Sequence, residues 1–246
     1  MAIGFSSIIG NWWIGFVFLF ELYSTNFRQK LLTLLGSVCA ILFMNQLSVP
    51  HLFNKITIQA EPTFMQTFYF ILIMGICSGW IMRMYKSYYF RLKIFFKTRS
   101  IYLKISLTAL LILALWQPTM WPYQSLGLNY IQTAFVDSKL FSDVAIKLVV
   151  TLFSVSLGFW GGEFIPLIYS GVYFGNALAH ALGFDIMLGV ALAAYLFVAG
   201  ATRLKWTGYF LTISLLGFSW LFWSYFLISL SVSFSGEKSI YQMNES

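Results

Sequence analysis

The chain has 246 residues, of which 59% are hydrophobic and 9% charged, and its mean hydropathy is +0.79. A soluble domain carries about 25% charged residues, so this composition excludes a soluble globular protein and requires lipid as the solvent. The net charge of +7 does not indicate a nucleic-acid partner, because the basic residues gather in one short span. We therefore expect an all-α, polytopic (multi-pass) membrane protein with one domain over residues 1–246, in a bacterial inner or plasma membrane.

Apolar runs separated by polar or glycine-rich turns predict helices, in chain order, at 3–23, 31–50, 63–90, 101–121, 124–136, 140–158, 165–183, 186–201, 206–216 and 217–234. Several are short and bounded by Gly, Pro or charged residues, namely 124–136, 165–183 and 206–216. Broken or re-entrant helices persist in a membrane only where protein or a wet cavity satisfies their free backbone groups. They commonly indicate a transport site.

The basic residues predict which loops face the cytoplasm. Alternating the first four helices places the loops 24–30 and 83–104 on one side, and 51–62 and 122–139 on the other. The first two loops hold nine Lys and Arg residues and the second two hold two. By the positive-inside rule, 83–104 is cytoplasmic and 51–62 is external. The loop 83–104 is also expected to contact anionic lipid headgroups.

The segment GFWGGEFIPLIYSGVYFGNALAHALGF, residues 158–184, places polar and flexible residues in a membrane-like sequence. Gly161 and Gly162 permit unusual backbone angles, and Pro166 suits the first turn of a helix. The free amides of that turn can bind an anion without a basic side chain. Glu163 is the principal functional candidate, because an intramembrane carboxylate is costly. The alternatives are that Glu163 caps its own helix and that the turn only packs.

This segment resembles the signature of the CLC family of chloride channels and anion/proton antiporters. The shared pattern is a glycine pair, a variable residue, an apolar residue and a proline, followed by a G-x-x-x-G spacing. Glu163 and Asn176 resemble the fluoride-exporting branch more than the chloride branch. A weaker likeness extends to AGAT at 199–202, FSGEKSIYQ at 234–242, GFSSIIGNWWIGFVFLFELY at 4–23 and GLNYIQTAF at 127–135.

The resemblance implies the second half of a CLC-like inverted-repeat fold, in which 1–23 ends the first repeat and 101–246 forms the second. It also implies transport of chloride or fluoride, with protons involved. The residues of the implied anion path are Gly161, Gly162, Glu163, Phe164, Ile165, Pro166, Asn176 and Tyr241. Family dimers form through helices that match 3–23, 31–50, 206–216 and 217–234, so a homodimer or a CLC-like partner chain is expected.

Two first-repeat motifs of the family, G-x-G-I-P and G-[KR]-E-G, do not occur, and family Thr-Pro pairs are replaced at 10–14 and 201–206. We therefore expect an anion channel or transporter that is incomplete without a missing N-terminal half. The alternative is a non-transporting remnant or a regulatory membrane subunit. At single positions, Asn176 can instead bond a neighbouring helix, and Tyr241 and Glu21 can simply lie at the membrane interface.

Catalytic motifs are not found in the sequence. It contains no H-E-x-x-H, no G-x-S-x-G and no P-loop pattern, and its two histidines, His51 and His180, are far apart. We therefore expect neither an enzyme nor a bound metal ion or cofactor.

Overall fold

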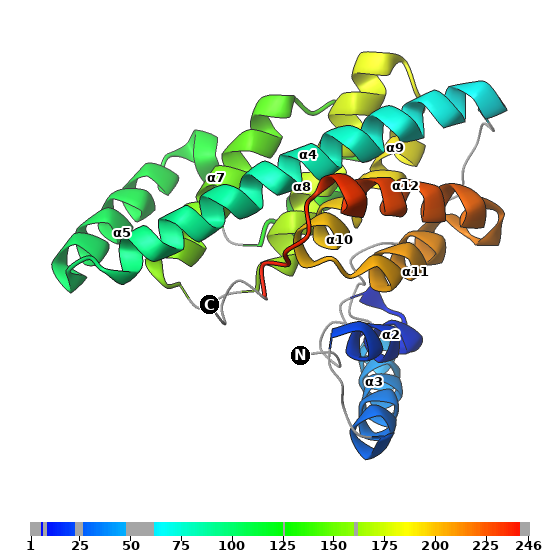
Figure 1. Cartoon of the computed structure of the whole chain (residues 1–246), viewed down its shortest axis with the longest axis horizontal. Coiled ribbons are helices and arrows are strands. Elements are labelled where there is room, and N and C mark those ends of the chain that lie inside the picture. The colour runs from blue at the N-terminus through cyan, green and yellow to red at the C-terminus, as the bar shows by residue number, and fades with distance from the viewer. Residues whose placement is uncertain are drawn as a thin grey trace.

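The computed structural model describes residues 6, 9–22, 27–47, 62–124, 126–159 and 162–241, and the regular structure in these ranges is entirely helical. Two N-terminal helices, α2 (Trp12–Leu22) and α3 (Phe27–Gln46), form what we call the arm. What we call the body comprises α4 (Phe64–Lys97), α5 (Ile101–Leu115), α6 (Leu128–Thr133), α7 (Phe141–Leu157), α8 (Phe164–Leu182), α9 (Ile186–Ala193), α10 (Leu196–Thr202), α11 (Lys205–Leu216) and α12 (Leu221–Phe234). Figure 1 shows the arm projecting below the body.

The longest helix, α4, runs diagonally across the body (Figure 1). It starts with a capping box, in which Thr63 accepts a hydrogen bond from the Gln66 amide and the Gln66 side chain accepts one from the Thr63 amide. Its 34 residues make a helix of about 51 Å. By length and composition, α4 is the one helix in the described part of the chain that can cross a membrane.

The expected cytoplasmic loop at 83–104 is largely helical, which corrects the prediction of a helix ending at residue 90. The helix continues to Lys97, because aromatic residues of its last third still pack into the core: Tyr85, Tyr89 and Phe96 are buried. The basic residues of this stretch therefore project from a helix with a defined face.

The core of the body lies around α8, which is buried from Ile165 to Ala179. It approaches α9 backbone to backbone. A Cβ added to Gly171 would lie 2.5 Å from the carbonyl oxygen of Ala193, and one added to Gly175 would collide with the carbonyl oxygen of Gly189. Close approach through small residues is a common way to pack helices in membranes.

Three predicted helices are shorter in the structure or interrupted. The helix expected at 101–121 ends at Leu115, and a 3-10 turn at Pro118–Tyr123 follows, because its two prolines cannot continue an α-helix. The helix expected at 124–136 is only α6. The helix expected at 186–201 is divided into α9 and α10, with Tyr195 at φ −108° and ψ 3° between them.

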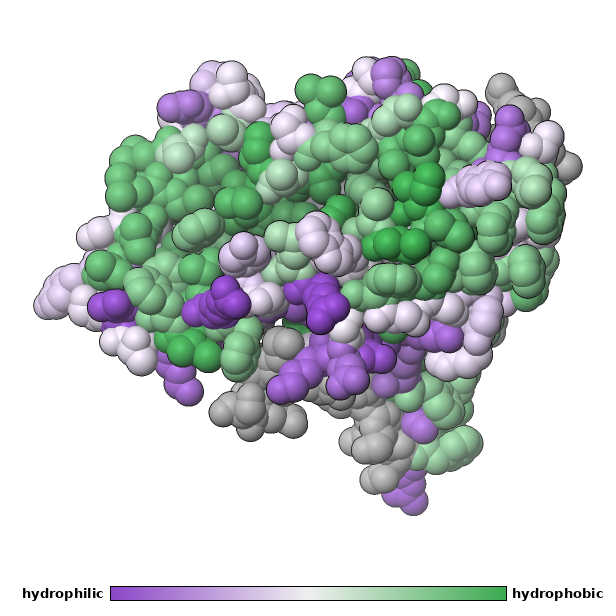
Figure 2. All heavy atoms as spheres, turned by 45° about the horizontal axis from the view of Figure 1, so that its top comes forward, coloured by the Kyte–Doolittle hydropathy of each residue, from purple (hydrophilic) through white to green (hydrophobic). Residues whose placement is uncertain are grey.

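The outer surface is strongly apolar. Figure 2 shows a face that is mostly hydrophobic, with hydrophilic residues along its lower part and at its upper edge. Large hydrophobic side chains are exposed all along α5, including Tyr102, Ile105, Leu110 and Leu113. A soluble monomer rarely exposes a contiguous apolar surface along a whole helix.

Candidate functional site

Glu163 stands at the N-terminus of α8, and its side chain makes no capping hydrogen bond. The alternative that Glu163 caps its own helix is therefore wrong. The carboxylate instead turns towards α4, where its Oε1 accepts a hydrogen bond of 3.0 Å from the Tyr89 hydroxyl. Its Oε2 is buried and has no hydrogen-bond partner among the residues that the structure describes. A buried carboxylate oxygen without a partner is costly and calls for a ligand or a proton.

A second polar group without a partner lies close by on α4. Tyr85 stacks on Tyr89, with ring centroids 6.3 Å apart. The Tyr85 hydroxyl is also buried and unpaired within the described ranges. Lys93 lies over the other end of the pair, with its Nζ 5.6 Å from the centre of the Tyr89 ring. The side of Glu163 that faces α4 is thus polar and aromatic.

Phe164, the next residue, joins three segments that are distant in the sequence. Its ring stacks on Tyr241 at 6.4 Å and meets Phe18 of α2 edge-on at 5.4 Å. The C-terminal segment, residues 235–241, which we call the tail, therefore brings Tyr241 to the start of α8. The backbone bond from the Ile240 amide to the Ala201 carbonyl, 3.2 Å long, holds the tail in this position.

On its other side the turn borders a cavity of about 330 Å³ between α5, α7 and α8, to which Gly162 and Pro166 contribute. Lys147 of α7 also lines this cavity. It is only 1% exposed, its Nζ donates to the carbonyl of Tyr123 at 3.0 Å, and it lies 4.8 Å from the centre of the Tyr169 ring. We expected an anion site without a basic side chain, but the amine of Lys147 lies in the cavity beside the turn. The available signal was a lysine inside the apolar segment 140–158.

Asn176 is not brought together with these residues, since it lies ten positions, or about 15 Å, further along α8 than Pro166. Its amide is fully buried and donates to the carbonyls of Ala134 at 2.6 Å and Asp137 at 2.9 Å, while its oxygen accepts from the Lys139 amide at 2.7 Å. These bonds attach the connection between α6 and α7 to α8. A place for Asn176 on an anion path stays a prediction.

The remaining predicted path residues are less informative. Ile165 is buried in the first turn of α8, and Gly161 lies outside the described residues. Within the described ranges, no group of three His, Cys, Asp or Glu side chains lies close enough together to hold a metal ion.

Sequence reasoning also missed the role of Glu21, for which an interfacial position was expected. Its carboxylate accepts hydrogen bonds from the amides of Trp206 and Thr207 at 2.9 and 2.7 Å, and from the Thr207 hydroxyl at 2.8 Å. Glu21 therefore caps the N-terminus of α11 from another helix. No local pattern reveals a cap supplied from so far away in the sequence.

The fold and the site together define a class: an all-helical protein with a strongly apolar surface and a buried carboxylate at the start of a central helix. Within that class, the family model described as voltage gated chloride channel matches residues 1–236. The chain therefore belongs to the voltage-gated chloride channel (CLC) family, which consists of multi-pass membrane proteins. The resemblance drawn from the segment 158–184 is confirmed.

Solved structures share the fold. A CLC-type fluoride/proton antiporter matches with a TM-score of 0.85 and 25% identity, over 99% of this chain and 63% of its own chain. A slow cyanobacterial Cl⁻/H⁺ antiporter matches with a TM-score of 0.83 and 19% identity, over 99% of this chain and 64% of its own. This chain thus spans less than two thirds of the length of either structure. A comparison with curated proteins finds no match.

Proposed function

We propose that residues 101–246 form the second-repeat side of a chloride or fluoride path that first-repeat helices, of the same or another polypeptide, complete. The observation that carries this proposal is the buried, unpaired Oε2 of Glu163 at the start of α8. The first amides of a helix have no partner within it and lie at the positive end of the helix dipole. These amides thus offer an anion a place to bind next to the Glu163 carboxylate.

The proposed mechanism is an electrostatic repulsion between Glu163 and the anion. When ionised, the carboxylate places a negative charge beside the start of α8 and repels the anion; when protonated, it no longer does so. The Tyr89 hydroxyl orients the carboxylate through its Oε1. The stacking of Tyr241 on Phe164 places a second aromatic hydroxyl group beside the same turn. Entry of the anion therefore depends on protonation of Glu163.

The test is to reconstitute the chain with first-repeat CLC helices in liposomes and to measure fluoride and chloride efflux from about pH 5 to about pH 8. Glu163→Gln should abolish the pH dependence of the flux, since glutamine cannot ionise. Asp137→Asn, at an exposed position between α6 and α7, is the matched control and should leave the profile unchanged. A Glu163→Gln protein with wild-type flux and wild-type pH dependence would falsify the proposal.

The second candidate is a non-transporting or regulatory membrane subunit, which a specific feature favours. Arg203, at the turn between α10 and α11, is the one non-glycine residue with positive φ (62°) in the described part of the chain. With Lys205 it places positive charge where the family turn is uncharged. If this candidate is correct, the same reconstitution yields no efflux above that of empty vesicles for wild type and for both variants.

We also propose that the chain lies in a lipid bilayer and pairs with a second copy or a CLC-like chain through α2, α3, α11 and α12. An apolar hollow of about 380 Å³ between α2 and α11, lined by Phe16, Phe20, Trp206 and Phe210, supports this surface. Crosslinking from a cysteine at Phe20 should yield a dimer, whereas one at Tyr102 on α5 should not. The reverse pattern would rule out this surface.

A further inference from the structure

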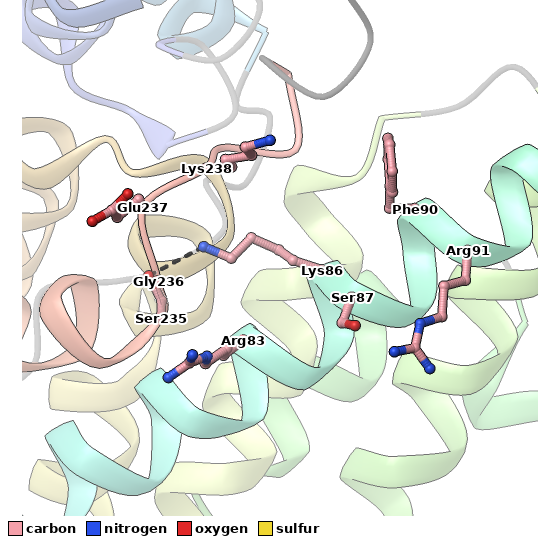
Figure 3. A pocket seen from close by; sticks show the side chains of 9 residues that line it. All are labelled: Arg83, Lys86, Ser87, Phe90, Arg91, Ser235, Gly236, Glu237 and Lys238. Atoms are coloured by element: carbon pink, nitrogen blue, oxygen red, sulfur yellow. Dashed lines mark hydrogen bonds between the residues drawn. The ribbon is translucent and has the colours of Figure 1, made fainter. Parts of the chain in front are cut away.

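A second cavity, separate from the start of α8, opens between α4 and the tail. It has a volume of about 610 Å³, and its lining consists of Arg83, Lys86, Ser87, Phe90 and Arg91 from α4 and Ser235, Gly236, Glu237 and Lys238 from the tail. Figure 3 shows the α4 residues along one side of the helix and the tail running beside it. We call this cavity the basic cleft. The α4 residues follow the i, i+3, i+4, i+7, i+8 spacing of a single helical face.

The charge of the basic cleft is strongly unbalanced. Four of its nine lining residues are basic and one is acidic, and the Glu237 side chain points away from α4 in Figure 3. The ion pair found among the described residues, between Lys139 and Asp137, lies elsewhere. Arg83, Arg91 and Lys238 therefore leave their positive charge uncompensated within the described part of the chain.

Lys86 differs from these three residues because the fold itself uses it. It is only 3% exposed, and its Nζ donates to the Gly200 carbonyl at 3.1 Å and to the Ser235 hydroxyl at 3.2 Å. Its bond to Gly200 places positive charge at the C-terminus of α10, which is electronegative. Nearby, Arg203 donates to the Gly236 carbonyl at 3.0 Å. These two residues attach the tail to the body, and Arg83, Arg91 and Lys238 remain available for a ligand.

The dimensions of the basic cleft select the ligand. A volume of about 610 Å³ is far more than a halide ion needs. Arg83 and Arg91 are about 12 Å apart along the helix axis, which leaves room for a headgroup between them, and guanidinium groups bind phosphate through paired hydrogen bonds. Ser87, between them, offers a hydroxyl. Tyr88 is 50% exposed on the adjacent side of α4 and provides apolar surface for an acyl chain.

We propose that the basic cleft binds a phosphate group, as carried by an anionic phospholipid headgroup or by free phosphate, and that this binding stabilises the tail. The tail is the segment that carries Tyr241 to Phe164, so a ligand bound between α4 and residues 235–238 sets the position of Tyr241. The basic cleft is thus a regulatory site that acts on the candidate anion site through the tail. This proposal needs no transport activity and goes beyond the proposed function.

The experiment uses the full chain in a neutral detergent and follows its thermal unfolding by tryptophan fluorescence. Three probes are compared at equal ionic strength: dioctanoyl phosphatidylglycerol, dioctanoyl phosphatidylcholine and inorganic phosphate. Saturating phosphatidylglycerol should raise Tm by about 5 °C and slow hydrogen exchange of the tail amides, and phosphatidylcholine should do neither. An equal effect of inorganic phosphate identifies free phosphate as the source, and an effect of phosphatidylglycerol alone identifies the headgroup.

The decisive variants remove the same charge inside and outside the basic cleft. Arg83→Gln with Arg91→Gln should abolish both effects. Lys97→Gln with Lys104→Gln, which removes two charges from the same basic stretch, should preserve them. Should the first pair not fold, Arg83→Lys with Arg91→Lys should reduce the Tm shift, because lysine lacks the paired donors. Equal loss in both glutamine pairs, an undiminished shift in the lysine pair or an equal shift with phosphatidylcholine overturns the proposal.

Discussion

The arm and the body are both rich in apolar residues but are packed differently. In the body, α8, α9 and α10 bury nearly every side chain, and α8 and α9 approach each other backbone to backbone. In the arm, α3 packs mainly against α2 and leaves much of its apolar surface exposed, at Phe27, Leu31, Leu32, Leu35, Leu42 and Phe43. Hydrophobicity therefore does not tell which residues of this chain are buried. Small and polar residues are better indicators of burial, because in lipid helices associate through close packing of small residues and through hydrogen bonds between polar ones.

Among substitutions that compare the body with the arm, the largest loss of stability is expected at the contact between α8 and α9. Gly175→Val places a side chain against the Gly189 carbonyl and within 2.6 Å of the Ala193 Cβ, and we expect a loss of about 3 kcal/mol or more in unfolding free energy. Leu35→Ala, on exposed α3, should cost less than about 0.5 kcal/mol. Thermal unfolding in detergent measures both. Comparable losses at the two sites would show that arm and body are packed alike.

Buried polar bonds should produce the next largest effect. Lys86→Met removes the donor of the Gly200 carbonyl and the Ser235 hydroxyl, which should lower the unfolding free energy by about 2 kcal/mol. Arg83→Met removes the same charge at an exposed position one turn earlier and should have almost no effect. A Lys86→Met protein as stable as the Arg83→Met protein would mean that the tail is attached to the body by other contacts.

The contact between arm and body, in which Glu21 caps α11, should contribute less to stability than the bonds of Lys86. Glu21→Ala removes three hydrogen bonds at the start of α11, with an expected loss of about 1–2 kcal/mol. Glu21→Gln should recover part of this loss, because one oxygen can still accept. Limited proteolysis should then cut the arm faster in the alanine variant than in the glutamine variant. Identical cleavage rates would indicate that Glu21 does not hold the arm.

The smallest effect is expected within the arm itself. The Nζ of Lys30 lies 3.7 Å from the centre of the Phe20 ring, which links α3 to α2. A cation–π contact at an exposed site contributes about 0.5–1 kcal/mol. Lys30→Ala should therefore cost no more than this, and Lys30→Arg should cost nothing. A loss as large as that of Lys86→Met would place the arm among the strongly packed parts of the molecule.

The sequence was sufficient to predict the family, the helical fold and the start of α8, because Gly162, Glu163 and Pro166 are local signals. It was not sufficient for contacts between distant segments. Glu21 reads as an interfacial residue until α11 lies beside it, and Lys86 reads as a loop residue until Gly200 and Ser235 surround it. These roles depend on oxygens and amides far away in the chain, which leave no periodicity or motif next to the residue itself.

The backbone contact between α8 and α9 limits how the candidate site can move. Because Gly171 and Gly175 lie directly against carbonyl groups of α9, α8 cannot slide or rotate without breaking the contact along its whole length. Motion at its N-terminus is therefore confined to side chains and the tail. Such rearrangements take place in nanoseconds to microseconds, whereas collective shifts of helices take microseconds to milliseconds. Any gate at Glu163 would thus work through side-chain rotamers and the tail, without a shift of α8.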